Sequence, residues 1–139
     1  MSTELQQDHD GLRRIMREFA HMMRTKGPEA MPDITRMRIA FSQLFREHMG
    51  REDGMIGIMR SGPAAVQGDP VAREHSRAMV ALFLRYSDHI KSWTPAQIEA
   101  DWHGYRDAVL QLQQDLFSRM EWEERYLHPL ITEHPRRAA

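Results

Sequence analysis

Two pairs of residues in this sequence have the types and the spacing to do chemistry. His48 is followed four residues later by Glu52, and Arg119 is followed four residues later by Glu123. Residues i and i+4 share one face of a helix, so an imidazole and a carboxylate at this spacing can grip one ion together. Imidazoles and carboxylates in a chain without cysteine suit iron, manganese or zinc. Alone, the His48–Glu52 pair suits either an ordinary hydrogen-bonded pair or half of a metal site on a helix face, and the placement of the other polar residues has to decide between them.

A histidine precedes each pair at a similar distance. His9 lies 39 residues before His48, and His75 lies 44 residues before Arg119. This pattern indicates a weak internal duplication in which one histidine has been exchanged for arginine. An arginine cannot lose its proton to become a metal ligand, so the two halves differ in what they can bind.

Helices must position these residues, and the chain shows four helical patterns. Apolar residues recur at spacings of three and four in each pattern, and glycine and proline lie in the breaks between them. Short connections between amphipathic helices predict an all-α fold, an antiparallel up-down four-helix bundle made of one domain over residues 1–139. The expected helices run from about Thr3 to Thr25, from Pro32 or Asp33 to the stop at Ser61-Gly62-Pro63, from Asp69 after a linker over Ala64 to Gly68, and from the Thr94-Pro95-Ala96-Gln97 cap to a bracket of Pro129 and Pro135.

Six polar residues fall on the inward faces of these helices, where a bundle core normally contains apolar side chains. They are His9, His48, Glu52, His75, Arg119 and Glu123. Buried charges are costly unless they are paired or bound to a metal. In an antiparallel hairpin, residues equidistant from the turn lie at one level. The midpoint of His9 and His48 falls in the Gly27-Pro28 break, and that of His75 and Arg119 falls at residue 97, in the third break. Each hairpin is therefore expected to bring its own pair to one height.

Three segments resemble the motifs of one known family. Asp8-His9-Asp10-Gly11-Leu12-Arg13 resembles the opening helix motif of the hemerythrin-like (HHE cation-binding) domains. Phe45 to Asp53, with His48 and Glu52, resembles the His-x-x-x-Glu-acidic motif of the second helix. Arg119 to Pro129 resembles the fourth-helix motif, which usually reads His-x-x-x-Glu-Glu and then Leu-Phe-Pro. The resemblance covers nearly the whole chain.

The resemblance implies a non-haem di-iron centre and no organic cofactor. It places His9, His48 and Glu52 in the first metal site and His75 and Glu123 in the second, with the two glutamates as bridging carboxylates. Members of the family bind or sense oxygen, store or sense iron, or act in redox and stress responses. We therefore expect a metal ion and O2 or another small oxidant as ligands. The expected role is sensing, storage or stress response rather than turnover of a large substrate.

Two departures from the family pattern leave alternatives open. Arg119 stands where the family has histidine, and His128 stands where it has phenylalanine. The second site could bind metal with one ligand fewer, Arg119 could take its place beside a single ion, or salt bridges could hold a site that binds no metal. In the last case the chain would be a metal-free interaction module, with a homodimer as one possibility. His128 is expected to be structural or exposed, as are His89, His103 and His134.

Composition narrows the class of protein further. The chain has 139 residues, a net charge of −1 and no cysteine. No basic excess points to nucleic acid, and no apolar run approaches the roughly 18 residues of a membrane span. Without cysteine there is neither a disulfide nor a thiolate-held cluster. These features favour a cytoplasmic protein that binds neither nucleic acid nor membrane.

Overall fold

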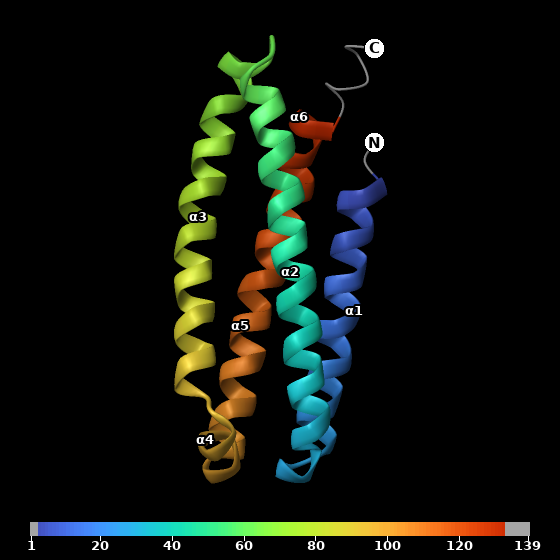
Figure 1. The fold of residues 1–139 in the computed structure, drawn as a ribbon, viewed down its shortest axis with the longest axis vertical. Coiled ribbons are helices and arrows are strands. Elements are labelled where there is room, and N and C mark those ends of the chain that lie inside the picture. The colour runs from blue at the N-terminus through green and yellow to red at the C-terminus, as the bar shows by residue number, and fades with distance from the viewer. Residues whose placement is uncertain (1–2, 133–139) are drawn as a thin grey trace.

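The computed structural model describes residues 3–132, and within that range every regular element is helical and none is a strand. Consecutive long helices lie side by side and run in opposite directions (Figure 1). The expectation of an all-helical fold is confirmed, whereas the predictions for His134, Pro135 and the residues after them lie outside the described range. The elements are α1 (Thr3–Thr25), the 3-10 turn η1 (Pro28–Ala30), α2 (Met31–Arg60), α3 (Ala65–Ser92), α4 (Pro95–Ala100), α5 (Trp102–Trp122), the π-helical turn η2 (Glu123–Leu127) and α6 (His128–Thr132).

The start of the third helix differs from the prediction. The segment from Ala64 to Gly68 was expected to be a linker, but α3 begins at Ala65 and contains Pro70. The cause is a tertiary contact, because a Cβ atom on Gly68 would lie 2.3 Å from the sulfur of Met59 on α2. Only glycine permits this approach, and the packing of the first turn on α2 outweighs the backbone donor that Pro70 lacks.

The fourth helical pattern is divided in two. The predicted cap is present, since the Thr94 hydroxyl accepts a hydrogen bond from the Gln97 N–H at 3.3 Å. The helix that it begins, α4, ends at Ala100. Asp101 then leaves helical geometry, and its carboxylate accepts a hydrogen bond from the Gly104 N–H at 3.0 Å, which caps α5. A second N-cap immediately after the first helix therefore sets the start of the long helix.

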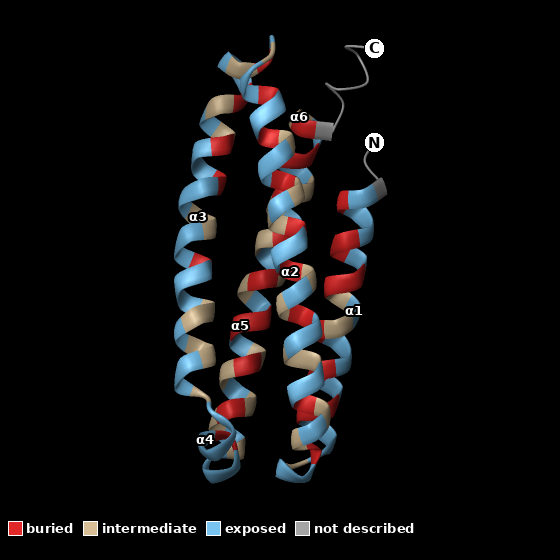
Figure 2. Ribbon diagram, viewed as in Figure 1, coloured by how far each residue is buried: buried red, intermediate tan, exposed pale blue. Residues whose placement is uncertain are grey.

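Buried residues gather on the faces that the long helices turn toward one another (Figure 2). They form three apolar clusters along the length of the bundle, and the middle and upper clusters leave a polar layer between them. The middle cluster includes Leu12, Met16, Phe45, Leu82, Leu116 and Met120, and the upper cluster includes Leu5, Ile56, Met59, Ala72, Leu127 and Ile131. None of the helices within residues 3–132 combines the length and apolar character needed to cross a membrane.

Candidate metal centre

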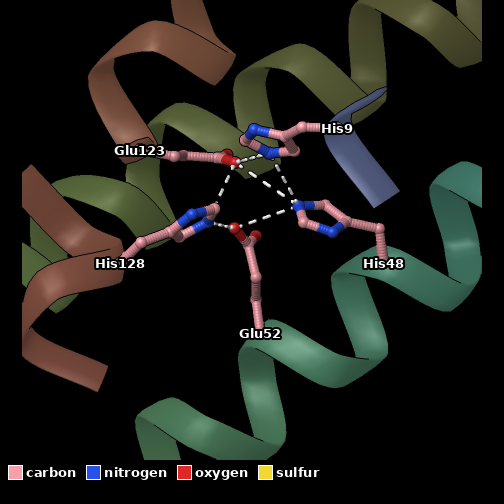
Figure 3. A group of neighbouring side chains, drawn as sticks. All are labelled: His9, His48, Glu52, Glu123 and His128. Carbon is pink, nitrogen blue, oxygen red and sulfur yellow. Dashed lines mark hydrogen bonds and ion pairs between the residues drawn. The ribbon is translucent and has the colours of Figure 1, made fainter. Parts of the chain in front are cut away.

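The polar layer contains five buried side chains whose ligand atoms converge. One atom from each lies within 4.8 Å of the others, and the set comprises three imidazoles and two carboxylates. The side chains point toward one another from different helices (Figure 3). They are His9 from α1, His48 and Glu52 from α2, Glu123 from η2 and His128 from α6.

The separations within the cluster are those of direct contact. His9 Nε2 lies 3.0 Å from His48 Nε2 and 3.0 Å from Glu123 Oε1. Glu52 Oε2 lies 3.0 Å from His48 Nε2 and accepts a hydrogen bond from His128 Nε2 at 2.7 Å. His9 and Glu52 are 0% exposed and Glu123 is 2% exposed, so water does not solvate these charges. Such a group needs a cation within it to offset the two carboxylates.

Carboxylates outside the cluster fix how the His9 and His48 rings are oriented. His9 Nδ1 donates a hydrogen bond to Glu124 Oε2 at 2.6 Å, and His48 Nδ1 donates one to Asp8 Oδ2 at 2.9 Å. With the Nδ1 protons committed to carboxylates, each ring turns its Nε2 lone pair inward. This carboxylate–histidine arrangement orients metal-ligating imidazoles and makes them more basic.

Two arginines complete this outer layer. Arg51 donates two hydrogen bonds to Asp8, at 2.8 and 2.6 Å, and Arg13 donates one to Glu124 at 2.7 Å. Burial acts to raise the pKa values of both carboxyls, but hydrogen bonds from Arg51 and His48 lower that of Asp8, and hydrogen bonds from Arg13 and His9 lower that of Glu124. Both groups are therefore ionised carboxylates that can hold the imidazole protons.

The contact between His9 Nε2 and His48 Nε2 sets two acceptors against each other unless a cation lies between or beside them. Without metal, that cation is a proton. Burial acts to lower the pKa of His48, but hydrogen bonds to Glu123 and Glu52 outweigh it and raise the pKa to about 10. Burial likewise acts to raise the pKa of Glu52, but hydrogen bonds from His128 and His48 and the nearby imidazole of His75 hold it below its usual range. The cluster thus stabilises positive charge at the point where the nitrogens meet.

The two carboxylates each turn their second oxygen away from this point. Glu52 Oε1 lies 3.3 Å from His75 Nε2, and Glu123 Oε2 lies 3.6 Å from His75 Nδ1 and 3.9 Å from Arg119 Nε. We call the side facing the three imidazoles the first half-site, and the side facing His75 and Arg119 the second half-site. The two glutamates are common to both.

Arg119 lies at the edge of the second half-site rather than inside it. Its guanidinium carbon lies 3.9 Å from the centroid of the Trp122 ring, and that ring also stacks on His75 at 6.3 Å. Four buried polar atoms here have no hydrogen-bond partner among the described residues: Glu52 Oε1, His75 Nδ1, Arg119 Nε and Arg119 Nη2. The second half-site is therefore less completely satisfied than the first, and its cation is the arginine.

His128 reaches the first half-site because the helix changes its period just before it. The His128 N–H bonds to the Glu123 carbonyl across five residues, which closes the π-helical turn η2. In an α-helix, residues i and i+5 point about 140° apart, whereas the wider π turn of about 4.4 residues brings them within about 50°. Of the two expectations for His128, exposure is excluded, since the residue is 8% exposed and its Nε2 lies 2.7 Å from Glu52 Oε2.

The structure places the five residues singled out from the sequence in this one polar layer. It brings His9, His48, Glu52 and Glu123 into the converging group and sets His75 beside them, in contact with both glutamates. Sequence reasoning missed His128, Asp8 and Glu124. One feature of the sequence could have indicated the carboxylates that bind the imidazole Nδ1 atoms. Asp8 is adjacent to His9, and Glu124 is adjacent to Glu123.

Comparisons of the chain with models of protein families, with curated proteins and with solved structures found no match.

Proposed function

We propose that this chain is a hemerythrin-like four-helix bundle that binds one non-haem iron ion in the first half-site. The observation that carries the proposal is the convergence of three imidazole nitrogens and two carboxylate oxygens within 4.8 Å, in a layer closed from water. A donor set of imidazole and carboxylate without thiolate suits iron, with manganese and zinc as the nearest competitors. His9, His48, His128, Glu52 and Glu123 would hold the ion.

The residues present fit a metal better than a structural salt-bridge network. A network made only for stability has no need of two Nε2 atoms at 3.0 Å with both Nδ1 protons directed outward to Glu124 and Asp8. That arrangement prepares lone pairs for one cation. Replacing buried ion pairs with apolar residues is often neutral or stabilising, so five such groups in one layer favour a binding role.

Arg119 favours one ion over two. Its positive charge lies 3.9 Å from Glu123 Oε2, on the side where a second ion would require ligands. His75 alone offers an imidazole there, and a guanidinium cannot replace a missing one. Of the three outcomes left open by the sequence, the one with Arg119 beside a single ion is therefore the best supported.

The size of the adjoining cavity favours a small ligand. A cavity of about 10 Å³ lies between the centre and the middle apolar cluster, lined by Leu12, Phe45, Leu82, His48 and Glu123 among others. That volume admits about one water-sized molecule. Iron would supply redox chemistry and, with five protein ligands, one open coordination position, so we infer that O2 or a similar small oxidant is the ligand that is bound or sensed.

Metal analysis tests the proposal directly. Protein reconstituted anaerobically with Fe(II) and desalted should contain about one iron per chain by mass spectrometry, and the His48→Ala variant should lose it. His103→Ala is the matched control, because His103 is exposed and distant from the centre in the sequence. Iron below about 0.2 per chain in the wild type would overturn the proposal and favour the metal-free interaction module.

A further inference from the structure

The outward face of α3 carries apolar side chains that no other part of the described chain covers. Val80, Phe83 and Leu84 are 60%, 50% and 58% exposed. Val80 and Leu84 share one helix face at a spacing of four, on the opposite side of α3 from the buried His75 and Leu82. In Figure 1, α3 lies at the outer edge of the bundle. Large apolar side chains gathered in this way are typical of an interaction surface.

Charged residues flank this apolar centre, with acidic and basic positions ordered so that a second copy in the reverse direction would present opposite charges to them. Glu74 and Arg77 precede it, Asp88 and Lys91 follow it, and all four are exposed. With Ala81 and Leu84 between them, these positions are spaced by three and four, as residues along a helix-packing face are.

We propose that two copies of this chain associate through α3 in antiparallel register, about a two-fold axis between Leu82 and Phe83. In that register Arg77 faces Asp88 of the second copy, and Glu74 faces Lys91 of the second copy. Ala81 meets Leu84 of the second copy, with Val80 beside them, whereas Phe83 lies about 100° around the helix from Leu84 and only borders the interface. A two-fold axis repeats each contact, so the interface gains four opposite-charge pairs around an apolar centre.

The same pattern excludes the parallel arrangement. Parallel copies in register would set Arg77 against Arg77 and Asp88 against Asp88, which is unfavourable. Within one copy, few ion pairs compete with the proposed contacts of these four charged residues. Asp88 and Lys91 form no ion pair with any other residue of the 3–132 range, and Glu74 and Arg77 pair only at 3.9 Å in an exposed position. Arg73 also lies on this face, but it is paired with Asp69 at 2.8 Å.

The interface lies apart from the ligands of the metal centre. The outward face of α3 lies across the helix from His75, and its link to the half-sites is the charge of Glu74, which acts to raise the pKa of Arg119. One helix face per copy places the interface at the small end of specific contacts, so we expect a dissociation constant of about 1–100 µM. Failure of the dimer would leave the metal proposal untouched, and loss of metal would leave the dimer unchanged.

Sedimentation velocity of the full chain from about 5 to 500 µM tests the proposal. The wild type should shift from monomer to dimer, and Leu84→Glu should remain monomeric while keeping its helical circular dichroism. Ile39→Glu is the matched control, because Ile39 is 62% exposed but lies on α2. A wild type that stays monomeric throughout, or a dimer that survives Leu84→Glu, would overturn the interface.

Charge reversal tests the register. Arg77→Asp alone and Asp88→Arg alone each set like charges opposite one another twice, and each should weaken the dimer about tenfold. The double variant Arg77→Asp/Asp88→Arg restores opposite pairs and should recover most of the wild-type affinity. A double variant as weak as the singles added together would overturn the antiparallel register.

Discussion

Replacing Asp8 with asparagine tests whether the outer carboxylates prepare the metal centre. Asp8 is 7% exposed, and its carboxylate accepts a hydrogen bond from His48 Nδ1 at 2.9 Å. Arg51 also donates a hydrogen bond to this carboxylate. Asparagine keeps the shape and one acceptor oxygen but removes the charge. The His48 ring would stay in place and become a less basic ligand.

The expected loss follows from the position of Asp8 in the structure. Substituting a carboxylate that orients a ligating histidine costs about 10–100-fold in metal affinity, and each tenfold step is about 1.4 kcal/mol. We therefore expect iron binding to weaken by about 1.4–2.8 kcal/mol. The half-buried Arg51 loses its charged partner, so the metal-free protein should also lose some stability.

Competition with a chelator of known affinity measures the loss of iron affinity. Denaturant unfolding of the chelator-treated protein measures the loss of stability. Asp10→Asn is the matched control, because Asp10 is exposed and its carboxylate accepts a hydrogen bond from Gln6 rather than from a histidine. Metal affinity of Asp8→Asn within about threefold of the wild type would refute the reasoning that Nδ1 is held to prepare Nε2.

Two further predictions concern the second half-site and the far end of the bundle. Arg119→His should raise the iron content from about one to about two per chain, and an unchanged content would show that the arginine does not stand in for a ligand of a second ion. Burial and the nearby charges of Arg38 and Arg85 lower the pKa of His89 to about 4, below its unfolded value of about 6.5. Its contribution to stability is thus fully present above pH 6.5 and is lost as the pH falls toward 4. Metal-free wild type should lose about 1–2 kcal/mol more than His89→Gln over that interval, allowing for partial exposure, and parallel unfolding curves for the two proteins would contradict this.

The sequence alone determined the all-helical fold, the extent of the first helix and the height of the polar layer, but not the start of α3 or the division between α4 and α5. Helical periodicity is a local property, so the spacing of apolar residues was enough to place Thr3–Thr25 as a helix and His9 and His48 on inward faces. Glycine and proline at the breaks fixed the hairpin midpoints, and equal distances from a turn mean equal heights. The common level of His9 and His48 agrees with that arithmetic, and helix packing then brings their Nε2 atoms to 3.0 Å.

The tertiary structure decided which polar side chains complete the centre. His128 lies five residues after Glu123, and α-helical spacing turns it away, so only the π turn brings it to Glu52. The side chain of Arg119 could have entered the second half-site, but the face of Trp122 holds it at the edge. Turn type and the direction of a long side chain depend on what packs against them from other helices, and spacing along one helix carries no record of those neighbours.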